Sequence, residues 1–367
     1  MKKLFSILVL ALSCSALFAQ QTTVALLNHE GTISTFYGAD ALVQAHKAAV
    51  HGDIITLSGG AFTAPSSWVK AVTLRGAGCY AGSDNSREVT SIGNAFKLAI
   101  PVEIETTMTI EGILFKTSFE FSTQCANTTF LKCRIDGELR RISRNTNFYQ
   151  CVLYKVTNQA YANYEANISM FNCLVADATN DNKYALYKLT NCILEYTAES
   201  HTSNAGKVWD LNYAIYKNCI FTGNLYANYP NDYNIPANCT ATNCLSCYCV
   251  YKNATETEDA IYDYNIFDYM SNTTNTYLEE GKPIHETISS VFKTYNGTDG
   301  FSFNEFYELT DEAKAMYLGT DGTQIGLHGG IGFDLIPSTL QITKCEVSPR
   351  STKDGKISVS IEVGIPE

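Results

Sequence analysis

Met170-Phe171-Asn172-Cys173-Leu174-Val175 is the stretch of sequence that decides the fold, because close copies of it recur through the middle of the chain. Each copy has an apolar residue, a variable one, an Asn-like residue and a cysteine, and two more apolar residues follow in most copies. Their cysteines are Cys133, Cys151, Cys173, Cys192, Cys219 and Cys244. Such recurrence indicates a repeat architecture.

The segments between the copies show which kind of repeat this is. A short apolar run bounded by polar, Asn-rich segments indicates a buried strand. No sustained helical period lies between the copies, so the helix-sized crossovers of βαβ units are excluded. A constant strand with spacers of variable length is typical of a coil from which loops of different length emerge. We therefore expect an all-β parallel solenoid with rungs about 4.8 Å apart.

The repeated cysteines have a structural explanation in such a coil. Equivalent residues of successive rungs lie above one another, and a free cysteine is a small residue that buries readily. Their Cβ vectors run parallel, which holds the Cβ atoms farther apart than the ~3.8 Å that a disulfide prefers. We expect an interior ladder of reduced thiols. The alternative is a disulfide framework, which export and an even number of cysteines after leader removal would favour.

A second column is formed by the residue before each cysteine, which is Asn172, Asn191, Asn218 and Asn243 in four copies. Asparagine tolerates turn conformations and bonds nearby backbone groups. We interpret the column as turn-stabilising rather than as a ligand site.

The start of the chain has the features of an exported protein. Met1-Lys2-Lys3 is basic, residues 4–12 are apolar, and small residues lead to Ala19-Gln20, as in a secretory signal peptide cleaved near Ala19. The apolar run is shorter than the roughly 20 helical residues that cross a bilayer. Lipidation at Cys14 is the alternative. We expect a secreted or cell-surface protein without a transmembrane segment.

Both ends of the coil are predicted to carry additional structure. Residues 39–50 are the most amphipathic helical segment, and a helix there would cap the open first rung. Lys356–Val363 alternates polar and apolar residues and predicts a short β tail. The expected units are a signal peptide at 1–19, an N-terminal strand and capping helix at 20–51, the coil at 52–335, and the β tail at 336–367.

The predicted helix, Gly52-Asp53-Ile54-Ile55-Thr56-Leu57 and Thr73-Leu74-Arg75-Gly76-Ala77-Gly78 together resemble the opening of pectin-lyase-like right-handed parallel β-helix proteins. Thr109–Phe115 resembles a following rung, and Gly319–Gly330 resembles their closing turn. The resemblance covers roughly residues 38–335 and implies a right-handed coil. It implies no single activity, because the superfamily includes lyases, hydrolases and noncatalytic adhesin-like proteins.

The segments that carry catalysis in the enzymes of this superfamily are missing. The sequence lacks the Asn-Thr-Asp, Asp-Asp, Gly-His-Gly and Arg-Ile-Lys segments of polygalacturonase-like hydrolases, and the Arg-x-Pro-x-x-Arg segment of pectate lyases. Asp177 and Glu195 fall on adjacent rungs but at strand positions that differ by one, so they are expected to face opposite sides. A noncatalytic protein is therefore favoured.

A basic patch stands out in a chain whose formal net charge is −11. This acidity disfavours nucleic acid and anionic membranes as partners. The patch consists of Arg134, Arg140, Arg141 and Arg144, with Lys155 on the next rung. Guanidinium groups bind carboxylates and sulfates bidentately, which makes an acidic glycan a candidate ligand. The alternative is a solvated turn whose arginines pair with acids such as Asp136 and Glu138.

Two further groups of residues are candidates for function. Tyr161 and Tyr164 lie in an Asn-rich loop, where their rings could stack on sugars. Cys239, Cys244, Cys247 and Cys249 cluster, and four thiolates can bind zinc. Core thiols or one local disulfide is the interpretation we prefer for this cluster, so no metal site is predicted, and the redox state of Cys239, Cys247 and Cys249 stays open.

Two functions are compatible with these features. The first is an exported, noncatalytic surface or secreted protein, a monomer that binds polysaccharide or another macromolecule along its long side. The second is a polysaccharide lyase or glycoside hydrolase acting on an acidic glycan. In a lyase, an arginine or lysine would act as the base and Ca²⁺ would assist; no other cofactor is expected.

Overall fold

The computed structural model describes most of the coil and parts of the segments that follow it. The described residues are 23–82, 88–122, 125–158, 165–180, 184–195, 209–211, 214–222, 240–247, 261–263, 266–267, 291–295, 301–303, 305–319, 321–337, 341–347, 351, 353–356 and 359–364. The predicted signal peptide lies outside them.

Each copy of the repeat forms two strands joined by a sharp bend. In one copy, β15 (Ala166–Phe171) ends at Asn172, and β16 (Leu174–Asn180) begins after Cys173. Asn172 has a left-handed backbone conformation with φ of 51°. Asparagine adopts this conformation at less cost than most residues with a side chain. The repeated Asn therefore marks the point where the chain turns from one side of the coil to the next.

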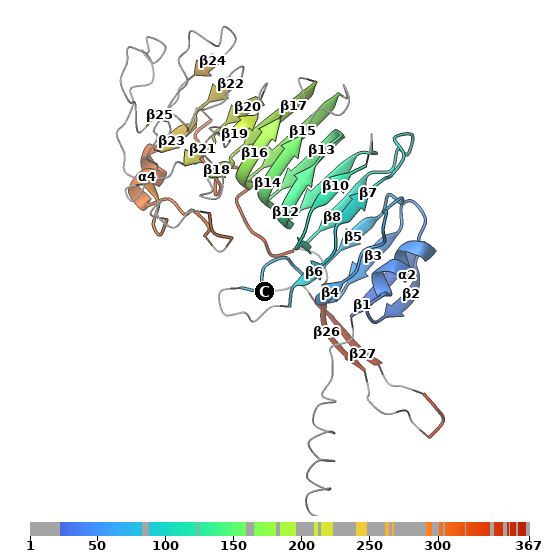
Figure 1. Ribbon diagram of the computed structural model, residues 1–367. Helices are drawn as coiled ribbons and strands as arrows, with labels where there is room; N and C mark the ends of the chain where they lie inside the picture. Colours follow the sequence, from blue (N-terminus) through green and yellow to red (C-terminus); the bar gives the residue numbers. More distant parts are fainter. Residues whose placement is uncertain are drawn as a thin grey trace, which may run out of the picture.

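The strands before the bends stack into a 12-stranded sheet, sheet A (Figure 1). From β3 onward its neighbours pair in parallel, so equivalent residues of successive rungs lie side by side. β1 pairs antiparallel with both β2 and β3. In spatial order, sheet A contains β2 (Thr32–Tyr37), β1 (Val24–His29), β3 (Ile54–Leu57), β5 (Thr73–Arg75), β8 (Met108–Glu111), β11 (Thr128–Leu131), β13 (Arg144–Tyr149), β15, β17 (Ala185–Thr190), β20 (Ala214–Lys217), β22 (Thr240–Thr242) and β24 (Ile261–Asp263).

The strands after the bends form a 13-stranded sheet, sheet B. Its main path contains β4 (Gly60–Phe62), β6 (Thr90–Ile92), β9 (Leu114–Phe115), β12 (Arg134–Arg140), β14 (Val152–Asn158), β16, β18 (Ile193–Glu195), β21 (Ile220–Thr222), β23 (Leu245–Cys247) and β25 (Ile266–Phe267). Off this path, β10 (Phe119–Phe121) pairs with β7 (Phe96–Leu98) and with the end of β12, and β19 (Trp209–Leu211) pairs with the end of β16.

The long strand β12 changes register at Gly137, which lies between its two halves. A Cβ atom at Gly137 would lie 2.3 Å from the backbone of Thr117 on the preceding rung. Only glycine fits such a close approach, so this position allows β12 to pair with β9 through its first half and with β10 through its second.

The interior of the coil is apolar and contains the predicted thiol ladder. The six repeat cysteines are fully buried, and their sulfurs are thiols rather than disulfides. The Cys173 thiol donates to the carbonyl oxygens of Phe171, at 3.3 Å, and of Phe148 on the preceding rung, at 3.6 Å. Burial holds the pKa of Cys173 and Cys192 well above the usual range. The prediction of a buried ladder of free thiols is confirmed.

Two elements lie beside the first rungs. Helix α2 (Ala41–Ala48), within the predicted range 39–50, packs against β1, β2 and β3. The hairpin of β26 (Gln341–Val347) and β27 (Val359–Gly364) is antiparallel and lies close to β3. In the part of the chain that the structure describes, no helix has the length and apolar character needed to cross a membrane.

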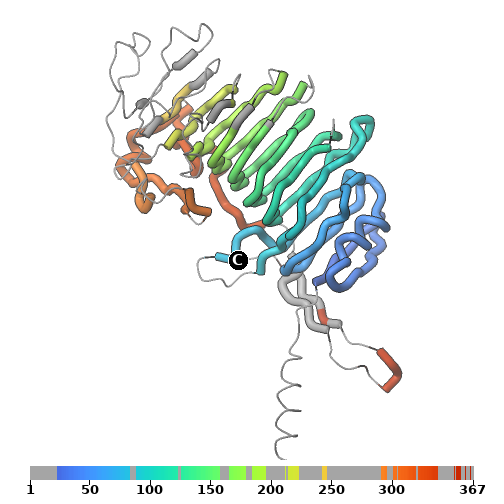
Figure 2. The backbone as a smooth tube through the Cα atoms, viewed as in Figure 1, coloured from blue at the N-terminus to red at the C-terminus, as the bar shows by residue number. Residues whose placement is uncertain are grey.

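The described residues between 291 and 337 differ from the expectation that they continue the coil. They lie on the outer face of sheet B, and we call them the C-terminal cover. Val291, Phe292, Tyr307 and Leu309 pack there, and helix α4 (Asp311–Met316) belongs to the same segment. In Figure 2 the orange part of the chain runs back along the coil toward its cyan rungs.

The sequence of the repeat explains this arrangement. Two apolar residues follow most of the repeat cysteines, and strand alternation sends them to opposite faces. In β14, Leu153 faces the interior, whereas Val152 faces outward and is buried against the cover. Leu174, Ile193, Ile220 and Leu245 continue this outer apolar column, which would otherwise be exposed to water.

Candidate functional site

The last part of the cover, residues 321–336, runs along the bends of the coil. We call this segment the strap. Side chains of the bend column hydrogen-bond to it on five rungs, and the order along the strap is opposite to the order along the coil. The bonds run from Asn218 to Asp321 and Thr323, from Asn191 to the carbonyls of Gln324 and Gly326, from Asn172 to those of Leu327 and Gly329, from Gln150 to that of Gly332, and from Lys132 to Asp334 and the carbonyl of Ile336.

These bonds decide between the two interpretations of the Asn column. The amide of Asn172, for example, is buried and donates to two carbonyl oxygens at 2.8 Å and 2.5 Å. The column therefore holds the chain's own C-terminal segment, and its structural role is confirmed. Sequence reasoning missed the strap as its partner.

The arginines predicted to lie on a turn stand where β12 meets β13: Arg140 is the last residue of β12, Arg144 is the first of β13, and only Arg141 lies between the strands. Arg140, Arg141 and Arg144 are exposed there. Arg140 pairs with Glu138, with 2.6 Å between Nε and Oε2, and Arg141 pairs with Glu120, with 2.7 Å between Nη1 and Oε1. These two arginines are therefore engaged by acids of the same region.

The remaining members of the predicted patch are also held by neighbours. Arg134 donates to both carboxylate oxygens of Asp136, at 2.5 Å and 3.0 Å. The Nζ atom of Lys155 lies 3.6 Å from Oδ2 of Asp177. Arg144 is different, because its Nη1 donates to the Val102 carbonyl at 3.0 Å and the described part of the chain places no carboxylate within ion-pair distance of it.

Two groups of predicted residues cannot be placed. Tyr161, Tyr164, Cys239 and Cys249 lie outside the described residues, as does the side chain of Cys247. Cys244 belongs to the thiol ladder. Among the side chains that the structure describes, no three His, Cys, Asp or Glu residues gather as a metal site would require.

The two acids that the sequence placed on adjacent rungs have different environments. Asp177 is partly exposed and lies beside Lys155, although burial still raises its pKa. Glu195 is fully buried on sheet B, beside Tyr295 of the C-terminal cover. Burial holds the pKa of Glu195 well above its usual range. A carboxyl group enclosed in this way is closed to a polymeric substrate.

The outer face of sheet A differs from that of sheet B, because no described segment covers its central rungs, β11 to β17. One row across these rungs consists of Thr129, Asn147, Ser169 and Lys188 in direct register. The first three are half-buried and Lys188 is exposed. The row presents hydroxyl and amide groups at the spacing of the rungs.

A second row on the same face is apolar. Leu131, Tyr149 and Phe171 lie in register and are half-buried. The rings of Tyr149 and Phe171 are stacked, with centroids 5.0 Å apart and planes 8° from parallel. We call Tyr149 and Phe171 the aromatic strip; Leu131 extends it by one rung.

A third row consists of exposed asparagines. Asn145 donates to the Asn127 side chain, and Asn167 donates to the Asn145 side chain, each at 3.3 Å. Arg144 directly precedes Asn145 in β13, so the one predicted cation without a described carboxylate partner borders this ladder. The face thus combines an aromatic strip, a row of hydroxyl and amide groups that ends in the exposed Lys188, a ladder of asparagines, and Arg144 at its margin.

Comparison with known proteins adds no identification. The chain matches no protein-family model, no curated protein and no solved structure.

Proposed function

We propose that this protein is an exported, noncatalytic β-solenoid that binds a polysaccharide along the outer face of sheet A. The observation that carries the proposal is the aromatic strip beside a hydrogen-bonded ladder of asparagines and a row of hydroxyl and amide groups, on a long face that the described chain leaves uncovered. The corresponding face of sheet B is occupied by the C-terminal cover.

The chemistry of the face suits a sugar polymer. A pyranose ring has apolar C–H groups on its faces and hydroxyls at its edge, so it can contact an apolar strip while it hydrogen-bonds to amides and hydroxyls alongside. The polar rows repeat at the rung spacing of about 4.8 Å, so several neighbouring sugars can be contacted in the same way. Arg144 at the margin adds a place for the carboxylate or sulfate of an acidic chain.

The finer description of the fold and location belongs to the same proposal. The pectin-lyase-like resemblance supports a right-handed coil, and the contacts of α2 with β1 and β3 support a capping role for this helix. The leader-like residues 1–19 support secretion or display at the cell surface, and we propose that the protein acts as a monomer with the β26–β27 hairpin as its tail.

The test is binding of a panel of neutral and acidic polysaccharides to the purified protein and to the variants Tyr149→Ala and Phe171→Ala. Each variant should weaken binding by up to about tenfold, because a stacking contact with an aromatic ring contributes roughly 0.5–1.5 kcal/mol beyond the area that it buries, and 1.4 kcal/mol is a factor of ten. Tyr37→Ala is the matched control, since Tyr37 is an exposed tyrosine on β2, away from the strip. Undiminished binding by both strip variants would refute the proposed face.

The same samples test the alternative function, a polysaccharide lyase or hydrolase. Bound polysaccharides are incubated with the protein, with and without Ca²⁺, and assayed for new reducing ends and for unsaturated products. The proposal expects neither product. Cleavage that disappears in Arg140→Ala or Arg144→Ala would replace it with the enzymatic alternative.

A further inference from the structure

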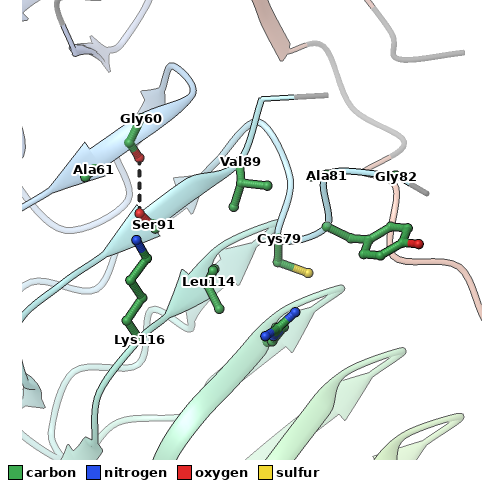
Figure 3. Close-up of a pocket in the computed structure, with 11 residues that line it drawn as sticks. Gly60, Ala61, Cys79, Ala81, Gly82, Val89, Ser91, Leu114 and Lys116 are labelled. Carbon is green, nitrogen blue, oxygen red and sulfur yellow. Dashed lines mark hydrogen bonds between the residues drawn. The ribbon is translucent and has the colours of Figure 1, made fainter. Parts of the chain in front are cut away.

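A pocket of about 720 Å³ lies on the outer face of sheet B, over its first rungs (Figure 3). Its floor is formed by residues of β4, β6 and β9, including Ser91 and Leu114. Its wall is the segment from Cys79 to Gly82. The volume falls within the ~300–1,000 Å³ that is usual for small-molecule sites. The pocket is separate from the sheet A face on which the proposed function rests.

The wall of the pocket is held by packing on both sides. The Tyr80 ring meets Phe306 of the C-terminal cover edge-on, with centroids 5.1 Å apart. Cys79 is almost completely buried, and its thiol donates to the Lys132 carbonyl at 3.1 Å. Burial raises the pKa of Cys79 to about 12. The thiol is therefore protonated at neutral pH and acts as part of the scaffold rather than as a nucleophile.

Among the lining residues that the structure describes, two are cationic, Lys116 and Arg134, and none is acidic. Lys116 is exposed, and Figure 3 shows its amine directed toward Ser91. The described residues place no carboxylate within ion-pair distance of this amine. The Ser91 hydroxyl is 3.5 Å from the Gly60 carbonyl, a distance that leaves it available to a ligand.

Arg134 is fixed in one orientation before any ligand arrives. Asp136 accepts from its Nε and Nη2, and the ring of Phe303 lies 3.8 Å from the guanidinium carbon. A guanidinium held on one edge and one face loses little rotamer freedom when a ligand meets its remaining N–H groups. With Asp136 counted against Arg134, the described residues of the site carry one net positive charge, that of Lys116.

We propose that this pocket binds a sugar-sized ligand that carries a single oxyanion group, a carboxylate or a sulfate. Lys116 supplies the uncompensated charge, Arg134 supplies directed donors, and Ser91 and the Tyr80 ring contact the uncharged part of the ligand. The formal net charge of −11 repels anions at long range, so binding of an anion here depends on the local cations of the pocket.

The test uses three probes of similar size, which are glucuronate, glucose 6-sulfate and glucose, with binding measured by calorimetry at low and physiological salt. At least one of the anionic probes should bind and should weaken as salt is added, because exposed charges are screened. Preference for one anionic probe assigns the ligand to carboxylates or to sulfates. Equal binding of glucose, or binding of none of the three, would overturn the proposal.

Variants locate the site. Lys116→Ala should weaken the anionic probe about tenfold or more, since a hydrogen bond to a charged group contributes roughly 1.5–3 kcal/mol. Lys116→Arg should retain most of the affinity. Lys97→Ala is the matched control, because Lys97 is an exposed lysine on β7 that does not line the pocket. Unchanged binding by Lys116→Ala would show that the anion binds elsewhere.

A second readout separates this site from the sheet A face. Saturating ligand should protect Lys116, and not Lys97, from acetylation measured by mass spectrometry. Tyr149→Ala should leave probe binding intact, and Lys116→Ala should leave polysaccharide binding to sheet A intact. Loss of protection at Lys116 or dependence of the probe on Tyr149 would refute a separate pocket site, whatever the outcome for the proposed function.

Discussion

Replacing Asn191 by alanine isolates the contribution of one rung to the docking of the strap. The Asn191 amide is buried and donates to the carbonyls of Gln324 at 2.9 Å and Gly326 at 3.3 Å. Asn191 also occupies the left-handed bend, with φ of 54°. The variant removes both hydrogen bonds. It also places alanine, which adopts the left-handed conformation at a higher cost than asparagine, at the bend.

The size of the effect follows from these two terms. Each bond contributes about 1 kcal/mol net, and the left-handed conformation costs alanine about 1 kcal/mol more than asparagine. The expected loss is about 3 kcal/mol, of which about 2 kcal/mol concerns the strap alone. Because 1.4 kcal/mol is a factor of ten, the strap should open about thirtyfold more often.

Hydrogen exchange followed by mass spectrometry measures this opening. The Gly326 amide, which donates to the Asn218 carbonyl at 2.8 Å, reports on the strap. Asn167→Ala is the control, because Asn167 is an exposed asparagine of β15 whose amide donates to the Asn145 side chain on sheet A rather than to the strap. Only Asn191→Ala should accelerate exchange at Gly326 by about thirtyfold. Equal exchange in the two variants would refute the view that the Asn column holds the strap.

Three further outcomes are expected. The six ladder cysteines should resist thiol reagents in the native protein and react after denaturation; a denatured protein without free thiols would contradict the ladder. Burial raises the pKa of Glu195, so the native state keeps a proton that the unfolded chain releases above about pH 4.5. The free energy of unfolding should therefore fall as the pH rises from about 4.5 toward the native pKa, by up to about 1.4 kcal/mol per pH unit. Glu195→Gln should flatten that fall in denaturation midpoints between pH 5 and 8, and an unchanged slope would exclude Glu195 as its source. If sheet A also binds acidic polysaccharides, Arg144→Ala should weaken their binding several-fold at low salt. Arg140→Ala should change it little, because Arg140 is already paired with Glu138. The reverse order of the two effects would show that Arg140 makes the contact.

The rung, the bend and the thiol ladder were predictable from the sequence because each depends on residues close together in the chain, and the same pattern of residues recurs in every copy of the repeat. Left-handed tolerance predicts the Asn position, and strand alternation predicts which neighbour of the cysteine faces inward. The exposure of Arg140 and Arg141 was likewise predicted correctly, although Arg140 ends strand β12 and only Arg141 lies beyond it. Their pairing was only partly predictable, since Glu138 is two residues from Arg140, whereas Glu120 comes from the preceding rung, whose register the sequence does not state.

The C-terminal cover was not predictable in the same way, because its contacts are irregular and distant in sequence. The glycines between 319 and 330 suggested a closing turn of the coil, but a Cβ at Gly329 would lie 2.3 Å from the Asn191 amide nitrogen. These glycines permit close contact with the bends. A signal was available, since a Gly-rich segment and an Asn column are complementary, but only the spatial order of the rungs shows that they meet. The aromatic strip was missed for a related reason, because Tyr149 and Phe171 belong to different copies of the repeat and become neighbours only in register.

The strap also restricts how this protein can change in length. In an ordinary solenoid each repeat contacts only its neighbours, so repeats can be gained or lost with little effect on the others. Here one segment bonds to bends on five rungs, from Asn218 to Lys132, and its last contact joins residues 204 positions apart. A duplicated or deleted rung would shift every bend beyond it by about 4.8 Å relative to a strap of fixed length. The length of the strap therefore fixes the number of rungs between Lys132 and Asn218. A gene rearrangement that adds or removes a rung there requires a compensating insertion or deletion between residues 321 and 336.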